Sequence, residues 1–232
     1  MHCFIISWQG YRDRALDIAS EIHHQVDRLT VVYSNEAGED ESGPGTWVGV
    51  PNDWFYARKF ETCLDRLGDN EPMLLIQADA SSDDWPGLAA LCTSAMRERP
   101  EIGIWSPQID STFWEDDRVG VAWSVDETIL YVAQPDGIVF AYSAAVAHRL
   151  RGLNYPDNKL GWGIDWLATC FCYVNNMLVV RDRSVVVGHT AGSGYSHVEA
   201  TDQMRRFLTQ MTTQEQIMHK LLVAFAFDRA RG

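Results

Sequence analysis

The sequence predicts an α/β fold in which a mixed central sheet is flanked by helices and followed by a helical C-terminal tail. Two observations carry this prediction. Over the first hundred residues, short β-branched runs alternate with amphipathic stretches, which is typical of a sheet whose strands are joined by crossover helices. Beyond residue 102 the strand candidates come closer together, which favours hairpins and antiparallel members in the same sheet. A chain of 232 residues is long enough to bury the core of one such domain.

The first hundred residues contain strand and helix candidates in the order β-α-β-β-α-β-α. Strands are predicted at residues 3–7, 29–34, 46–50 and 73–77. Apolar residues recur at helical spacing in two stripes, which comprise Ala15, Ile18, Ala19, Ile22 and Val26 in the first and Phe60, Cys63, Leu64 and Leu67 in the second. Pro86 suits the first turn of a third helix, because the amide hydrogen that proline lacks has no helical partner there.

The second half begins with strands and ends with helices. Strands are predicted at 102–105, 119–123, 129–132 and 137–141, with a final hairpin formed by 177–181 and 184–188. Helices are predicted at 143–150 and 164–173, separated by the loop sequence RGLNYPDNKLGWG. Thr212 and Glu215 form a T-x-x-E capping box, which predicts the start of a helix within the tail.

The charge of the chain excludes some classes of function. Asp and Glu number 32 against 19 Lys and Arg, which gives a formal net charge of -13. Because a protein that binds nucleic acid without specificity needs cations against the phosphates, no nucleic-acid partner is expected. No apolar run reaches the length of a membrane span, and polar residues soon interrupt the opening MHCFIISWQG. We therefore expect a cytoplasmic protein, with peripheral contact at the inner face of the membrane as the alternative.

The cysteines favour reduced thiols. There are five of them, an odd number without paired metal-type spacing, so a disulfide framework is not expected. Cys170 and Cys172 stand beside Phe171 and Trp166, and we expect them to be buried in preference to binding a metal.

The C-terminal tail is locally basic. From residue 201 onward it carries five basic residues and three acidic ones. We expect one domain over residues 1–196 and a helical extension over 197–232. The extension is predicted to pack on the domain or on a second copy in a homodimer, through Leu208, Ile217, Leu221, Leu222 and Phe225. Contact with a membrane surface is the alternative.

Two aspartates stand where α/β proteins commonly bind ligands. In LLIQADA, a hydrophobic strand delivers Asp79 to its carboxyl end, where a carboxylate can ligate a hard cation or simply begin a turn. In GWGID, glycines on both sides of Trp162 let the backbone pass close to a ligand, and Asp165 then opens a helix. Asp165 could cap that helix or act as a general base. The local sequence leaves both interpretations open for each aspartate.

A histidine and a loop of small residues come next. In VVVGHT, His189 leaves a buried strand much as Asp79 does, either as a metal ligand or as a structural histidine. In AGSGY, Gly192 and Gly194 could fold over a phosphate with Tyr195 as a lid. The loop is not a Walker loop, and the sequence contains neither a G-x-G-x-x-G after the first strand nor the G-x-S-x-G of a hydrolase elbow.

Taken in this order, the strand ending in QAD, the GWGID segment, GHT and the glycine loop resemble the glycosyltransferases of GT-A fold. In that family the strand ends in a D-x-D motif, and the resemblance places Gln77, Ala78 and Asp79 there, with Gln77 in place of the first carboxylate. GWGID is similar to the W-G-x-E-D segment of inverting galactosyltransferase-type enzymes, which implies that Asp165 is the catalytic base. His189 falls where many members of the family complete the metal site.

The resemblance covers residues 3–196 and implies further binding positions. For the donor these are Ser7, Gln9, Ser34, Asn35, Tyr56, Arg58, Lys59, Gln77, Ala78 and Asp79. For the acceptor or its sugar they are Trp162, Gly163 and Ile164, of which Ile164 replaces an acidic residue of the family segment. For positions 56–59, an ordinary exposed helix start is the alternative.

The activity that the resemblance implies is transfer of a sugar from a nucleotide-diphosphate sugar, most often a UDP-sugar, to an acceptor hydroxyl with inversion. Asp79 and His189 would hold a divalent cation, and the nitrogen ligand favours Mn²⁺ over Mg²⁺. The acceptor could be a glycan, a lipid-linked molecule or a small molecule, as in polysaccharide biosynthesis. The carboxylates missing at 77 and 164 leave a second interpretation, a GT-A-like protein that binds a nucleotide or glycan without catalysis. A nucleotide-sugar hydrolase and a nucleotidyltransferase are further alternatives.

Overall fold

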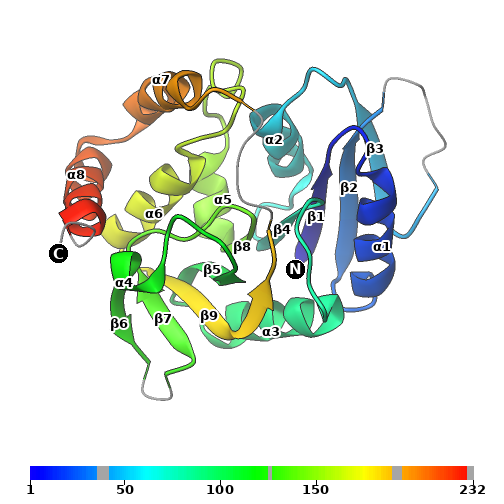
Figure 1. Cartoon of the computed structure of the whole chain (residues 1–232), viewed down its shortest axis with the longest axis horizontal. Helices are drawn as coiled ribbons and strands as arrows, with labels where there is room; N and C mark the ends of the chain where they lie inside the picture. The colour runs from blue at the N-terminus through cyan, green and yellow to red at the C-terminus, as the bar shows by residue number, and fades with distance from the viewer. Residues whose placement is uncertain (36–41, 125–126, 190–194, 229–232) are drawn as a thin grey trace.

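The computed structural model describes residues 1–35, 42–124, 127–189 and 195–228, and one nine-stranded sheet forms its centre (Figure 1). The strands lie in the order β3-β2-β1-β4-β8-β5-β9-β7-β6. Their bounds are β1 His2–Ser7, β2 Arg28–Ser34, β3 Thr46–Val50, β4 Met73–Gln77, β5 Ile102–Ile109, β6 Gly120–Trp123, β7 Ile129–Val132, β8 Val139–Tyr142 and β9 Leu178–Val187. The predicted mixed sheet is confirmed.

Strand β8 determines which loops meet at one edge of the sheet. It lies between β4 and β5 and is antiparallel to both, whereas β1 is parallel to β2 and β4, and β9 is parallel to β5. The carboxyl ends of β1, β2, β4, β5 and β9 therefore lie at the same edge. Because Ile76 near the end of β4 pairs with Val139 at the start of β8, the loop that precedes β8 lies there too. Open α/β sheets bind their ligands at this edge.

Helices cover both faces of the sheet, as Figure 1 shows. Their bounds are α1 Arg12–Ile22, α2 Tyr56–Arg66, α3 Trp85–Glu98, α4 Asp116–Val119, α5 Ala144–Leu150 and α6 Ile164–Val174. α1 and α3 pack on one face, and α2, α5 and α6 pack on the other. Since successive strand residues point to opposite faces, Phe4 joins the cluster with α2 while Ile5 joins the cluster with α1. The order predicted for the first hundred residues is confirmed.

The final hairpin predicted over residues 177–188 is wrong. A single strand, β9, occupies this region and pairs with β5 on one side and β7 on the other. Two charged residues in its middle have partners: Arg181 is fully buried and its Nη1 donates to Asp116 of α4 at 2.7 Å, while Asp182 accepts from the backbone and hydroxyl of Ser184. α4 also shortens the strand predicted at 119–123 to β6.

The five cysteines are free and buried, as predicted. Cys170 and Cys172 lie in the hydrophobic cluster that α6 shares with the sheet, and burial raises the pKa of Cys170 to about 12. Metals bind the thiolate form of cysteine, so this environment favours the buried structural role over metal binding.

The tail continues as α7 (His197–Phe207), a 3-10 turn (Leu208–Gln210) and α8 (Thr213–Asp228). The predicted capping box is confirmed, since Thr212 N donates to Glu215 Oε2 at 2.7 Å and Glu215 N donates to Thr212 Oγ1 at 3.3 Å. α8 packs against α6, with Leu222 and Ala226 buried (Figure 1). Ile217 and Leu221 do not pack on the domain, because they remain 56% and 60% exposed. A second copy as their partner and a domain boundary at residue 196 stay predictions.

An ion pair anchors this tail to α5, and breaking it should lower the free energy of unfolding. Glu215 is 2% exposed and binds Arg149 through two contacts of 2.8 and 2.9 Å. Removing one partner of a buried pair leaves the other charge uncompensated, so Glu215→Gln should destabilise the protein by about 3 kcal/mol in urea denaturation. The control Glu98→Gln breaks an exposed pair with Arg97 and should leave the free energy of unfolding nearly unchanged. Equal losses in the two variants would contradict the anchoring role.

Candidate functional site

Asp79 and His189, the two predicted metal ligands, meet at the carboxyl edge of the sheet. A bridge between the segments that follow β4 and β9 brings them together, because Ser81 N donates to Gly188 O at 2.9 Å and Gly188 N donates to Ser81 O at 2.8 Å. Asp79 Oδ2 lies 3.5 Å from His189 Nε2. Two residues that are 110 positions apart in the sequence thus form one pair.

The chemistry of this pair fits a divalent cation. Asp79 Oδ1 is buried and has no hydrogen-bond partner among the described residues. The contact with Asp79 raises the pKa of His189, burial of the imidazole opposes this, and the charge of Asp136 adds to the increase. A carboxylate oxygen and an imidazole nitrogen suit Mn²⁺. No group of three or more His, Cys, Asp or Glu side chains within the described part of the chain is arranged to hold a metal, so this pair would need oxygens from a ligand or water.

Asp165, the predicted base, lies in the first turn of α6. Its Oδ1 accepts from Trp166 N at 2.8 Å, and its Oδ2 accepts from Gln134 Nε2 at 2.6 Å. Burial raises the pKa of Asp165 to about 6, with a contribution from the charge of Asp136, while the two hydrogen bonds act in the opposite direction. A carboxyl group with a pKa near neutrality can accept a proton and release it again, which is what a general base requires. The N-cap position of α6 belongs to Gly163.

The backbone of GWGID depends on glycine. Gly163 has a φ of +92°, and a Cβ at this position would come within 2.9 Å of Met204 Cγ on α7. Gly161 has a φ of +81°, and a Cβ there would lie 2.2 Å from Cδ1 of Tyr56. Ile164 is 2% exposed and belongs to the hydrophobic cluster. Its side chain therefore packs in the core, and the acceptor contact expected of it cannot come from that side chain as it stands.

Gln77, expected beside the donor, binds protein backbone instead. Its Nε2 donates to Gly137 O at 2.7 Å in the loop before β8. The neighbouring Ala78 is fully buried, and its N donates to Ile6 O at 2.9 Å. An aspartate at position 77 would offer only acceptor atoms and could not make the contact with Gly137. The substitution in the D-x-D position thus has a structural consequence, because it joins β4 to the loop that carries Gln134 and Asp136.

Lys59 connects the ends of β1 and β2. Its side chain is fully buried, and Nζ donates to Ser7 O at 2.6 Å and to Ser34 Oγ at 2.7 Å. Nζ also lies 4.3 Å from the ring centre of Trp8. Burial lowers the pKa of Lys59 to about 7. The alternative of an exposed helix start is wrong for this residue, which organises two of the predicted donor positions.

The remaining donor candidates lie around this edge. Asn35 Nδ2 donates to the hydroxyl of Tyr33 at 2.7 Å. The guanidinium of Arg58 lies 4.5 Å from the ring centre of Trp54, and Gln9 is exposed. No nucleotide contact follows from these positions alone.

A row of aromatic rings joins the end of β1 to the GWGID segment. Trp8 stacks on Phe55 at 5.2 Å, and Phe55 meets the edge of Tyr195 at 5.7 Å between ring centres. The hydroxyl of Tyr195 accepts from Trp162 Nε1 at 3.0 Å. Tyr195 therefore lies between the predicted donor and acceptor positions. The two other residues of the predicted phosphate loop, Gly192 and Gly194, fall outside the described residues.

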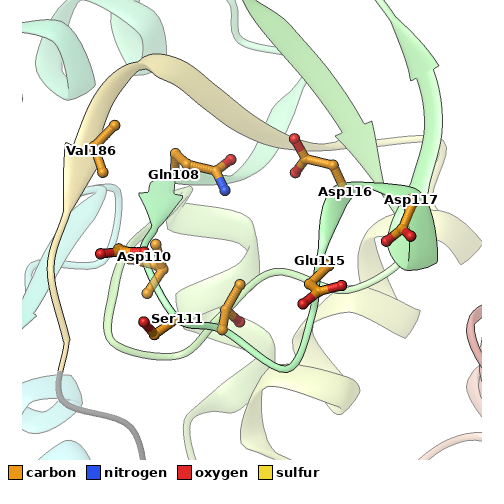
Figure 2. Close-up of a pocket in the computed structure, with 9 residues that line it drawn as sticks. Gln108, Asp110, Ser111, Glu115, Asp116, Asp117 and Val186 are labelled. Carbon is orange, nitrogen blue, oxygen red and sulfur yellow. The ribbon is translucent and has the colours of Figure 1, made fainter.

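A cavity of about 440 Å³ adjoins the site at the ends of β5 and β9 (Figure 2). Its walls carry four carboxylates, those of Asp110, Glu115, Asp116 and Asp117. Thr112, which also lines it, donates through its hydroxyl to Asp136. Because negative walls repel a phosphate, this cavity is not suited to an anionic ligand.

Comparison with solved structures identifies the fold. No family model and no curated protein matches the sequence. A mannosyltransferase from Pyrobaculum calidifontis, solved with GDP-Man and Mn²⁺, superposes with a TM-score of 0.66 at 16% identity, over 97% of this chain and 69% of its own. The chain has a GT-A-like fold. This α/β fold, with its nine-stranded mixed sheet, is the one that the motif order predicted.

Two further structures share the GT-A-like fold. GalNAc-T7, solved with UDP, GalNAc and Mn²⁺, superposes with a TM-score of 0.59 at 12% identity and covers 84% of this chain, which spans only 44% of that protein. A CMP:2-keto-3-deoxy-manno-octonic acid synthetase complexed with CTP gives a TM-score of 0.50 at 11% identity, over 90% of this chain and 98% of its own. The GT-A-like fold is therefore shared with both glycosyltransferases and sugar nucleotidyltransferases.

Sequence reasoning missed Gln134 and Asp136, which the structure places beside Asp165 and His189. Both lie in the stretch QPDG between two strands, which resembles any polar turn. The proximity of an unassigned acidic residue to a β-strand was the only available signal. Their contacts arise only when β8 inserts beside β4.

Proposed function

We propose that the protein is a glycosyltransferase that moves a sugar from a nucleotide-diphosphate sugar, a UDP-sugar by preference, to an acceptor hydroxyl with inversion. The observation that carries this proposal is the position of Asp165, a carboxylate with a pKa of about 6 at the same sheet edge as the Asp79 and His189 pair. A base and a candidate cation site on one α/β edge are what such a transfer needs. The GT-A-like fold adds support.

In the proposed reaction, Asp165 takes the proton of the acceptor hydroxyl as that oxygen attacks the anomeric carbon. The new bond forms on the face opposite the bond to the diphosphate oxygen, which breaks as the nucleotide leaves. Asp165 then returns its proton to water. A divalent cation, when bound by Asp79 and His189, would supply positive charge against the diphosphate.

Other residues would bind and orient the substrates. Lys59 holds the ends of β1 and β2 in place and thereby shapes the donor edge. Trp162 carries an apolar ring face suited to a sugar, and its hydrogen bond to Tyr195 fixes the orientation of that ring. The acceptor would be a glycan, a lipid-linked molecule or a small molecule. No helix within the described ranges is long and apolar enough to cross a bilayer. A cytoplasmic location with or without peripheral membrane contact, and a homodimer, remain proposals.

Calorimetric titration tests the donor half of the proposal. The purified protein is titrated with a panel of nucleoside diphosphates and nucleotide sugars, each with Mn²⁺ and with chelator. Binding of one nucleotide class that requires the metal would support the proposal, and release of the nucleoside diphosphate in the presence of candidate acceptors would then identify the transfer. Absence of binding throughout the panel would overturn it.

A catalytically degenerate binding protein is the second candidate. It is favoured by the absence of carboxylates at both 77 and 164, where Gln77 binds backbone and Ile164 packs in the core. This candidate predicts metal-dependent nucleotide-sugar binding without transfer or hydrolysis. Release of free sugar without an acceptor would instead indicate a hydrolase.

The pKa of Asp165 predicts the pH dependence of transfer. The base must be deprotonated before the reaction, so kcat/KM should be constant above about pH 6 and fall about tenfold for each pH unit below it. A pH series of initial rates at fixed Mn²⁺, with nucleotide affinity measured in parallel, separates loss of the base from loss of binding. A rate that stays constant down to pH 4 would contradict the role of Asp165.

A further inference from the structure

The strongest unassigned feature near the site is the carboxamide of Gln134. Gln134 is fully buried, and its Nε2 donates to Asp165 Oδ2 at 2.6 Å. Its Oε1 is also buried and has no hydrogen-bond partner among the described residues. A buried carbonyl oxygen without a donor destabilises the folded protein, so the arrangement is not explained by stability alone.

Three contacts hold the loop that carries Gln134. Ala133 N donates to Val119 O at 2.8 Å just before it. The hydroxyl of Thr112 donates to Asp136, and Gln77 Nε2 donates to Gly137 O at 2.7 Å. Gln134 therefore lies on a segment tied to β4, to the end of α4 and to the loop after β5, which restricts the movement of its side chain.

We propose that Gln134 is a positioning residue for Asp165, and that Gln77 supports it by holding the same loop. The inference rests on the proposed function, in which Asp165 is the base. Trp166 N and Gln134 Nε2 together fix both oxygens of the carboxylate, so that its remaining lone pairs point in defined directions. Gln77 stands in the place of the first D-x-D carboxylate. In this proposal it helps to position the base Asp165 and does not bind the sugar donor.

The chemistry of the two amides explains why glutamine is needed at each position. In each contact the side chain must donate a hydrogen bond. Gln134 donates to the carboxylate of Asp165, and Gln77 donates to the backbone carbonyl of Gly137. Glutamate at 134 would place two carboxyl groups 2.6 Å apart, where both cannot be ionised. Leucine has a similar volume but leaves Asp165 Oδ2 without its donor.

Other titratable groups face Asp165 and must be held constant in a test. Asp136 raises the pKa of Asp165 by its charge. The remaining groups whose titration is linked to Asp165 are Tyr56, Tyr142 and Cys170, all with pKa values raised by burial and therefore neutral near pH 6. None of the variants below replaces any of these residues.

The test is a carbon-13 NMR titration of the Asp165 carboxyl in full-length protein labelled at aspartate, with the signal assigned by its loss in Asp165→Asn. The wild-type midpoint is expected near pH 6. Gln134→Leu should raise it by about one pH unit, because removing a hydrogen bond to the charged form of a carboxyl group disfavours that form. Gln77→Leu should raise it by a smaller amount. The control Gln203→Leu, which removes a buried glutamine from α7, should leave it unchanged.

An unchanged or lowered midpoint in folded Gln134→Leu would overturn the inference. If Gln134→Leu does not fold, Gln77→Leu decides, since an unchanged midpoint there also overturns it. The nucleotide titration described above is independent of this measurement. Failure to bind any nucleotide would overturn the proposed function while the midpoint still reports whether Gln134 acts on Asp165.

Discussion

Replacing Asp165 by asparagine should reduce sugar transfer about a thousandfold and leave nucleotide-sugar affinity nearly unchanged. The asparagine keeps the size of the side chain but has no proton affinity near neutral pH, so the acceptor hydroxyl loses its base, and general-base catalysis contributes about 10²–10⁴-fold. Transfer is measured as nucleoside diphosphate released in the presence of acceptor, and affinity by calorimetry. The expected result is a loss of kcat, because the donor contacts that we propose lie at Asp79 and the ends of β1 and β2.

The control for this variant is Asp157→Asn, which changes an exposed aspartate in the loop leading to α6. It should leave turnover within about twofold, as is usual for a surface substitution away from a site. Thermal unfolding of both variants shows whether a loss of turnover comes from the missing base or from a less stable protein. This check is needed because Gln134 and Trp166 both donate to the carboxylate, whereas an asparagine at position 165 presents one donor and one acceptor to them. Near wild-type turnover in folded Asp165→Asn would remove Asp165 from the role of base.

Asp79→Asn is expected to lower the affinity for a nucleoside diphosphate in Mn²⁺ about a hundredfold. The substitution removes the negative charge of a partly buried carboxylate that would hold the cation, and a hundredfold loss corresponds to about 2.7 kcal/mol of binding free energy. In chelator, both proteins should bind the nucleotide equally weakly. His189→Ala should change affinity in the same direction through the other ligand, which lies 3.5 Å from Asp79.

Asp83→Asn provides the matched control, because Asp83 is exposed on the same segment after β4. It should not alter the dependence of affinity on Mn²⁺. Equal nucleotide affinity of Asp79→Asn and wild-type protein in Mn²⁺ would contradict the cation site. Metal-independent binding by the wild-type protein would do the same and would leave Asp79 as a turn residue.

Local patterns account for what could be predicted of the fold. Residues 73–76 of β4 are all apolar because they are buried on both faces of the sheet, and Pro86 and the capping box of Thr212 mark helix starts through contacts within one turn. Such features depend on neighbours in sequence. The prediction failed at β9, where buried Arg181 finds its partner Asp116 65 positions away. A buried charged residue in a strand is unfavourable without a partner, and the local sequence does not reveal a partner so far away.

The sequence by itself determined the α/β class and the order of the elements over the first hundred residues, and it singled out the three residues on which the proposed chemistry depends: Asp79, Asp165 and His189. Each follows from the end of an apolar run or the start of a helical one. Only the tertiary structure decided that Asp79 and His189 meet, that Lys59 is buried, and that Gln134 binds Asp165 while Gln77 holds its loop. For the two glutamines, the physical reason is that β8 lies between β4 and β5, which brings the loop before β8 to the carboxyl edge of the sheet. Periodicity and local spacing carry no information about which distant strands pair.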